Sequence, residues 1–186
     1  MLARAAQWGV TSITLLEVYP SRRVQQLSEI DSPLRIRLVP FLEFQEPDRR
    51  KQPEYPTVPA HLADRVSVSG LKYLLDGTPE ERSAATRVPY ADDPPTSGQV
   101  DFPPEELRAI LREAQQRNVQ LLLHAIGDRT TETLLNAMEA PTHGRRSDFA
   151  LNTARASCPD LVPRAKALGV IVVENPSNFA FSELLQ

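Results

Sequence analysis

Short apolar runs alternate with amphipathic stretches along most of the chain. Three runs begin in the same way, because a helical pattern ends in Gly or Asn and Val follows at once: Gly9-Val10, Asn118-Val119 and Gly169-Val170. Gly and Asn accept the left-handed conformation that closes a helix, and Val favours the start of a strand. This repetition indicates βα units on a parallel sheet.

The pattern predicts six parallel strands with helices between them. We expect strands over residues 10–18, 34–42, 66–75, 119–124, 149–156 and 171–173, and helices over residues 2–7, 22–30, 103–118, 130–139 and 159–168. A Pro-rich excursion at 43–60 and a long loop at 78–101 interrupt them, and such long loops tend to be lids or binding loops. Because a complete (β/α)8 barrel needs eight strands and about 250 residues, the sequence predicts an open α/β sheet or a partial TIM barrel.

Length, charge and cysteine content narrow the classes of function. With 186 residues the chain can build one core, so we expect a single incomplete barrel domain over residues 1–186. The net charge of −3 argues against a strong nucleic-acid or anionic-membrane role, and no apolar run approaches the roughly 20 residues of a membrane span. One cysteine, Cys158, excludes an internal disulfide and fits a reducing compartment, which favours a cytoplasmic location.

The stretch from Asn118 to Arg129 carries the clearest chemistry. Its apolar run ends on His124, and a tight Ala-Ile-Gly-Asp turn leads into the next helix. Barrel enzymes present ligands and bases at such strand ends. The ordinary alternative is a strand-end histidine that is satisfied by a backbone partner. Asp128 stands where a helix N-cap would stand.

Four blocks together carry a family likeness: GLKYLLDG at 70–77 with RSAA at 82–85, PYADDPPTSG at 89–98, HAIGDR at 124–129 and LGVIVVENPSNF at 168–179. They resemble the metal-dependent amidohydrolase superfamily, and most closely its formamide-deformylase-like branch. The resemblance implies a (β/α)8 barrel with one or two divalent metals, commonly zinc, that hydrolyses C–N bonds other than peptide bonds. The predicted strands would then be the family's second to seventh, about six βα units.

The resemblance also implies roles for individual residues. Lys72 lies at the position of the family's metal-binding lysine, which is often carbamylated, and His124 lies at that of the fifth-strand histidine. Asp76 and Arg82 flank the loop after the lysine strand and would make substrate-side contacts, with ordinary turn chemistry as the alternative. For Lys72 an inward position would bury the amine, lower its pKa and favour carbamylation. An edge lysine that discourages strand pairing is the other interpretation.

The sequence departs from the family pattern at several ligand positions. It has no His-x-His, since its histidines are His61, His124 and His143. Thr153 stands at the sixth-strand histidine, and Asn178 stands where the seventh-strand block often has a histidine. We also expect the chain to stop before the eighth strand and its aspartate. A catalytic zinc usually needs about three protein ligands, so these residues predict a degraded metal site.

The expected function is therefore that of an amidohydrolase-family protein, inactive as this isolated chain. Its partners would be a small amide substrate, if it is active, and neither nucleic acid nor membrane. A non-catalytic truncated homologue that acts as a binding module is the alternative. A third interpretation is a barrel that another chain completes. An open barrel would expose strand edges at 10–18 and 171–173, which invite self-association.

Overall fold

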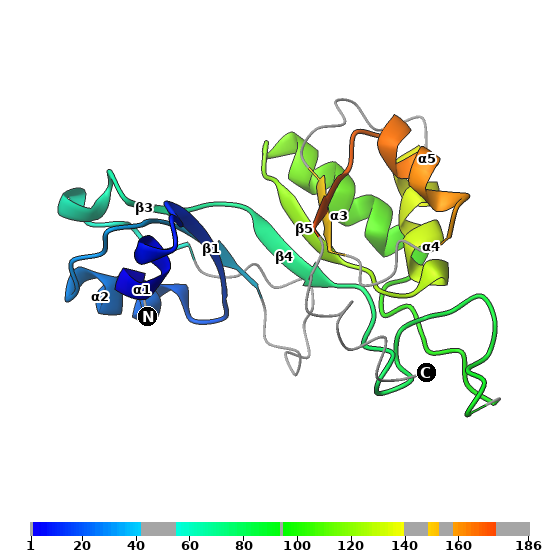
Figure 1. Ribbon diagram of the computed structural model, residues 1–186. Helices are drawn as coiled ribbons and strands as arrows, with labels where there is room; N and C mark the ends of the chain where they lie inside the picture. Colours follow the sequence, from blue (N-terminus) through cyan, green and yellow to red (C-terminus); the bar gives the residue numbers. More distant parts are fainter. Residues whose placement is uncertain (1, 42–54, 94, 140–148, 153–157, 174–186) are drawn as a thin grey trace. The chain divides into compact units, whose positions relative to one another are not determined.

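The structure, a computed structural model, describes residues 2–41, 55–93, 95–139, 149–152 and 158–173 (Figure 1). Two compact units make up the chain, Met1–Lys72 and Tyr73–Gln186. The predicted organisation as one barrel domain stays a prediction.

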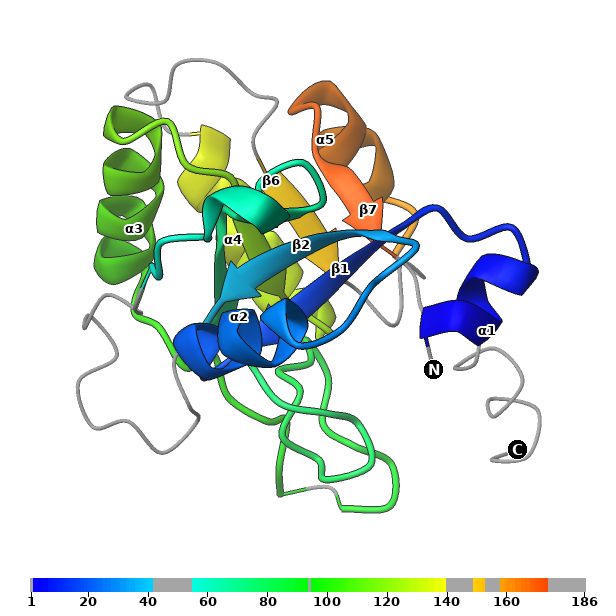
Figure 2. The ribbon, with the colours of Figure 1, turned by 90° about the vertical axis from the view of Figure 1, so that its left-hand side faces the viewer.

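The first unit is a parallel sheet with a helix on one face. Its strand order is β1-β2-β3, and both strand pairs are parallel. Figure 2 shows α2 beside β1 and β2. The elements are α1 (Leu2–Gln7), β1 (Ser12–Glu17), α2 (Pro20–Ser28), β2 (Arg35–Pro40), the 3-10 helix η1 (Ala60–Leu62) and β3 (Val66–Val68).

Strand register explains the core of this unit. Ile13 pairs with Ile36, and Ile36 pairs with Val66, so one apolar row crosses all three strands. Val24 and Leu27 of α2 are buried in the same cluster as Ile36 and Val66. Burying such a side chain stabilises a fold by about 1.5–3 kcal/mol relative to leaving it exposed. The apolar face of α2 therefore holds the helix on this sheet.

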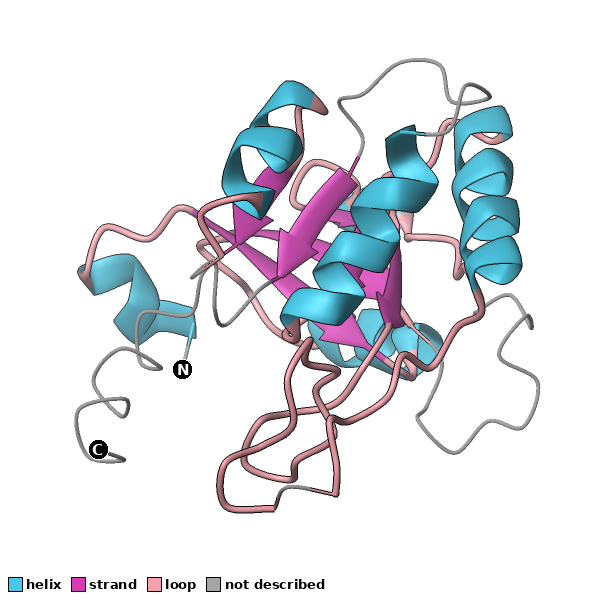
Figure 3. Cartoon of the chain, turned by 90° about the vertical axis from the view of Figure 1, so that its right-hand side faces the viewer, coloured by secondary structure: helices cyan, strands magenta, loops and turns pink. Residues whose placement is uncertain are grey.

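The second unit contains the sheet with more described strands, four in the order β4-β5-β6-β7. The pairs β5–β6 and β6–β7 are parallel. Figure 3 shows α3, α4 and α5 on one face of the strands. The elements are β4 (Leu71–Leu74, which crosses the boundary between the units), α3 (Pro104–Gln116), β5 (Leu121–His124), α4 (Asp128–Glu139), β6 (Phe149–Asn152), α5 (Leu161–Ala167) and β7 (Ile171–Val173).

Helical spacing and strand alternation produce the core of the second unit. Leu107, Leu111 and Ala114 of α3 are buried and lie on one face of the helix. Leu121 and Leu123 of β5 are buried as well. The longest described helix, α3, has 13 residues, and no described helix is long and apolar enough to cross a membrane.

The α/β class and the parallel pairing are confirmed, and most expected elements are present. The expected strand at 66–75 is wrong as a single element, because it breaks at Ser69-Gly70 into β3 and β4, which belong to different sheets. The described residues thus contain seven strands and not six. A partial (β/α)8 barrel stays a prediction.

Two expected helix starts are also corrected. Helix α2 begins at Pro20, two residues before the expected start, because Pro is well accommodated in the first turn. Helix α4 begins at Asp128, so Asp128 is its first residue and not the residue before it. The Asp128 Oδ1 atom accepts hydrogen bonds from the N–H groups of Arg129 and Arg87.

The break at Gly70 gives a direct test of this fold. Gly70 has φ of +84°, a conformation that L-residues adopt at a cost of about 1–2 kcal/mol. We predict that Gly70→Ala lowers the free energy of unfolding by about 1 kcal/mol, measured by urea denaturation. Ser67→Ala, at an exposed position of β3, is the matched control. Equal stability of Gly70→Ala and Ser67→Ala would contradict the left-handed break.

Candidate functional site

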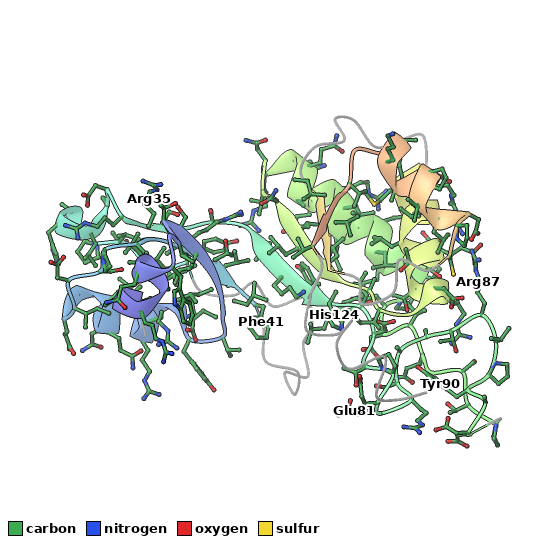
Figure 4. All side chains as sticks on the ribbon, in the orientation of Figure 1. Arg35, Phe41, Glu81, Arg87, Tyr90 and His124 are labelled. Atoms are coloured by element: carbon green, nitrogen blue, oxygen red, sulfur yellow. The ribbon has the colours of Figure 1, made fainter. Side chains whose placement is uncertain are left out.

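His124 is the last residue of β5, as the sequence predicts. Its side chain is half-buried, and its backbone carbonyl accepts a hydrogen bond of 2.9 Å from the N–H of Leu75. Ala125 and Ile126, which follow, are buried. Figure 4 shows His124 at the end of the second unit from which the loop with Glu81 and Tyr90 extends. The strand therefore presents the histidine beside this loop.

Asp76 is the polar centre of this region. The residue is only 1% exposed. Oδ1 accepts the N–H of Ile126 at 2.9 Å, and Oδ2 accepts the N–H groups of Gly127 at 2.8 Å and Ala85 at 3.1 Å. Burial raises the pKa of Asp76, and the three backbone donors oppose that rise. The carboxylate thus joins the turn after His124 to the loop after β4.

Three glycines allow the backbone to close around residues 83–85. A Cβ on Gly127 would lie 1.9 Å from the carbonyl oxygen of Ala85, and one on Gly98 would lie 2.1 Å from that of Ala84. At Gly77 it would lie 2.0 Å from Ser83 Oγ. These spacings are far below van der Waals contact, so each position admits only glycine without movement of its neighbours.

Further hydrogen bonds hold the long loop, which the sequence predicts to be a lid or binding loop. The Tyr90 hydroxyl donates to the Ala84 carbonyl at 2.9 Å, and Arg129 donates to the Gly98 carbonyl at 2.7 Å. Arg87 forms ion pairs with Glu132 of α4 and with Asp160 before α5. The described part of the loop is therefore fastened to the helices of its own unit.

Lys72 is buried, with 5% of its surface exposed. Its backbone pairs with Phe41 in a parallel bridge. Burial lowers the pKa of Lys72 from its ordinary 10.5 to about 8. Within the part of the chain that the structure describes, no hydrogen bond or ion pair is found for its ammonium group. Burial favours the inward interpretation of this lysine over the edge interpretation.

Lys72 and His124 belong to different units, so a metal site shared by them stays a prediction. Thr153, Asn178 and His143 lie outside the described residues. Among the described residues no group of three or more His, Cys, Asp or Glu side chains could hold a metal ion.

Arg82 and Cys158 take part in contacts of the loop region. Arg82 has φ of +53°, pairs with Asp92 and donates to the Glu80 carbonyl at 2.6 Å. The Cys158 thiol lies 3.5 Å from Asp128 Oδ2, and burial, together with this carboxylate, raises its pKa. A raised pKa disfavours the nucleophilic thiolate. Substrate contacts of Asp76 and Arg82 stay predictions.

The sequence did not reveal the hydrogen bonds of Asp76. Its Asp-Gly pair after an apolar run is a turn signal, and the partners of the carboxylate lie up to 51 residues away. The available signal was the position of Asp76 itself, directly after an apolar run that ends at Leu75. A carboxylate at such a place needs donors from elsewhere in the fold.

Comparison with known families and structures agrees with this architecture. The family model described as "Amidohydrolase family" matches residues 1–178. Among curated proteins, YtcJ of Bacillus subtilis, which is named as an amidohydrolase, is 32% identical over 113 residues. The protein LONG AFTER FAR-RED 3 of Arabidopsis thaliana is 27% identical over 120 residues. These matches cover 60% and 63% of the chain but 21% of either relative.

Two solved structures share the fold. Both are described as uncharacterized metal-dependent hydrolases, one from Pyrococcus furiosus with a TM-score of 0.66 and 20% identity, the other from Pyrococcus horikoshii with 0.68 and 24%. Each alignment covers 92% of this chain, and 35% and 34% of those chains. The chain thus spans about one fifth of the curated relatives and about one third of these structures.

The buried amine of Lys72 predicts a dependence of stability on pH. Because its pKa falls from 10.5 to about 8 on folding, the unfolded chain binds more protons between these values. Stability therefore rises with pH from about 8 to 10.5, by about 3 kcal/mol for a full shift. We predict that Lys72→Met is more stable than the parent at pH 7 and that the difference narrows above pH 8.

Denaturation with urea at pH 7, 8, 9 and 10 measures this difference. Titration of other groups is common to both proteins and cancels in the comparison. Lys166→Met removes an exposed lysine from α5 and is the control for loss of charge. A difference between the parent and Lys72→Met that stays constant over the whole pH range would contradict a lowered pKa.

Proposed function

The chain belongs to the amidohydrolase family, and from this premise we propose that it carries strands two to seven of a (β/α)8 barrel, with β3 and β4 as the two parts of the fourth, and an incomplete metal site. The reaction of the whole barrel is the metal-dependent hydrolysis of an amide C–N bond, with zinc as the metal. The match of the family model over residues 1–178 is the observation that carries the proposal. The names of the two similar Pyrococcus structures, metal-dependent hydrolases, are consistent with it.

Lys72 and His124 are the metal ligands in this proposal. His124 ends a strand beside a structured loop, which suits an imidazole ligand. A buried lysine with a pKa near 8 has a substantial neutral fraction at physiological pH. The neutral amine is the form that reacts with carbon dioxide, and the carbamate so formed supplies a carboxylate oxygen to a metal.

Two ligands do not complete a catalytic site. Catalytic zinc commonly has three protein ligands and an open position for water. The chain has three histidines in all, and Thr153 and Asn178 offer neither an imidazole nor an anionic group. We therefore propose that this chain alone does not hold a catalytic metal and does not hydrolyse amides.

Metal analysis tests this proposal on the purified 186-residue chain. We predict less than about 0.1 zinc per chain after dialysis, because the ligand set is incomplete, and no hydrolysis of formamide substrates above the buffer rate. His124→Ala is the diagnostic variant, and His61→Ala in η1 is the matched control. Retention of one zinc per chain in the parent and in His61→Ala, with its loss in His124→Ala, would overturn the proposed inactivity.

Open strand edges point to partners for this chain. Among the described strands, β1 and β7 each lie at one edge of their sheet. Ile171, Val172 and Val173 of β7 are 50%, 44% and 43% exposed. An apolar edge strand is a template for pairing with another chain. Self-association through β7 is part of the proposal.

A lysine on the β7 edge tests the self-association. We predict that the parent chain associates with rising concentration and that Val172→Lys shifts it to the monomer, since edge lysines block strand pairing. Sedimentation velocity over a range of concentrations measures the effect. Val162→Lys, at a 48% exposed site of α5, adds the same charge away from a strand edge. Equal dissociation of both variants, or a parent that is monomeric throughout, would refute pairing through β7.

A further inference from the structure

We propose that Asp76 is a positioning residue that fixes His124 and the loop segment at Ala85 as one unit. The proposal rests on the proposed function only for the role of His124 as a metal ligand. The geometry itself lies within the second unit and involves described residues alone. It assigns to Asp76 an action through the backbone, distinct from a substrate contact.

Two consecutive residues after β4, Leu75 and Asp76, form hydrogen bonds with the backbone of His124 and of the turn that follows it. Leu75 donates its N–H to the His124 carbonyl at 2.9 Å. The next residue, Asp76, accepts the N–H groups of Ile126 and Gly127 at 2.9 and 2.8 Å. The backbone from 124 to 127 therefore has hydrogen bonds to residues 75 and 76 at its beginning and its end, which restricts the orientation of His124.

The same carboxylate reaches the loop. Oδ2 accepts the N–H of Ala85 as well as that of Gly127, so one oxygen joins the two segments. The N–H of Arg129 in turn donates to the Ala85 carbonyl at 3.1 Å. The N–H of Ala85 is thus bonded to Asp76 and its carbonyl to Arg129, and both partners also bond to or adjoin the turn after His124. A shift at Ala85 is transmitted to that turn.

Packing leaves no space for independent movement. Ala84 and Ala85 have no exposed surface, and Ala125 has none either. The absent side chain of Gly127 permits an approach to Ala85 that any Cβ would prevent. Close-packed interiors transmit displacements because they contain few voids. The loop and the histidine strand end therefore behave as one body, and Asp76 is its common acceptor.

The test compares Asp76→Asn with a variant of similar stability loss elsewhere. Asn has the size of Asp but presents an NH2 group where Oδ2 or Oδ1 accepts, so backbone donors are left facing a donor. Leu168→Ala removes a buried side chain after the C-terminal end of α5. In a parallel βα unit this point lies at the opposite end of the sheet from His124.

The readout is the NMR signal of the His124 ring in the full chain, assigned by comparison with His61→Gln, His124→Gln and His143→Gln. We expect Asp76→Asn to shift or broaden the ring signal of His124 and the amide signals of Ala85, Ile126 and Gly127. Leu168→Ala, with a comparable loss of stability, leaves them in place. Unchanged His124 signals in folded Asp76→Asn, or equal changes in Leu168→Ala, would overturn the proposal.

If Asp76→Asn does not fold, hydrogen exchange of the parent protein tests whether the loop and the turn after His124 open together. We expect the amides of Ala85, Ile126 and Gly127 to have protection factors within about tenfold of each other, because one opening releases all three. Exchange at Ala85 about a hundredfold faster than at Ile126 and Gly127 would overturn the common unit.

A Co²⁺ titration of the parent separates this proposal from the proposed function. The proposed function expects no His124-dependent cobalt spectrum from this chain alone. A cobalt spectrum in the parent that is lost in His124→Ala would overturn that expectation, and the NMR and exchange results would still support or overturn the role of Asp76 by themselves.

Discussion

Burial of one carboxylate is the constraint on which the second unit depends. An unmatched charge removed from water costs several kcal/mol, so a buried Asp has to find donors. Asp76 finds them in residues that are 9, 50 and 51 positions along the chain. Satisfying this one side chain closes contacts that are remote in sequence. It brings the ends of β4 and β5 and the beginning of the long loop to the same place.

Local sequence patterns predict those structural features that depend on residues close together in the chain. Spacing of apolar residues predicted α3 and β5, and the glycine and asparagine stops predicted the starts of β1, β5 and β7 to within two residues. These signals act within a few residues of the chain. The strand break at Gly70 was missed, since the run from 66 to 75 is apolar on both sides of it. Which sheet each half joins is decided by partners far along the chain, and no local pattern carries that information.

The candidate site likewise has features that local patterns predicted and long-range contacts that they did not. The position of His124 at the end of β5 was predicted, because a histidine that ends an apolar run before a Gly turn is a local signal. Burial of Lys72 was one of two interpretations that strand alternation left open. The long-range contacts escaped prediction: the donors of Asp76, the approach of Gly127 to Ala85, and the ion pairs of Arg87. Each joins segments separated by at least a strand or a helix.

The scaffold and the metal chemistry have separate physical requirements. Three backbone N–H groups donate to Asp76 without the help of a metal, so this part of the fold does not depend on metal ligands. Lys72 is different, because its amine is buried and its pKa is lowered by desolvation alone. No other interaction of the amine offsets this desolvation penalty in the part of the chain that the structure describes. A carbamate, or an anion supplied by further strands of a barrel, would relieve it. In the proposed function, the metal chemistry of the family accounts for this buried amine, which otherwise breaks the rule that buried charges are paired.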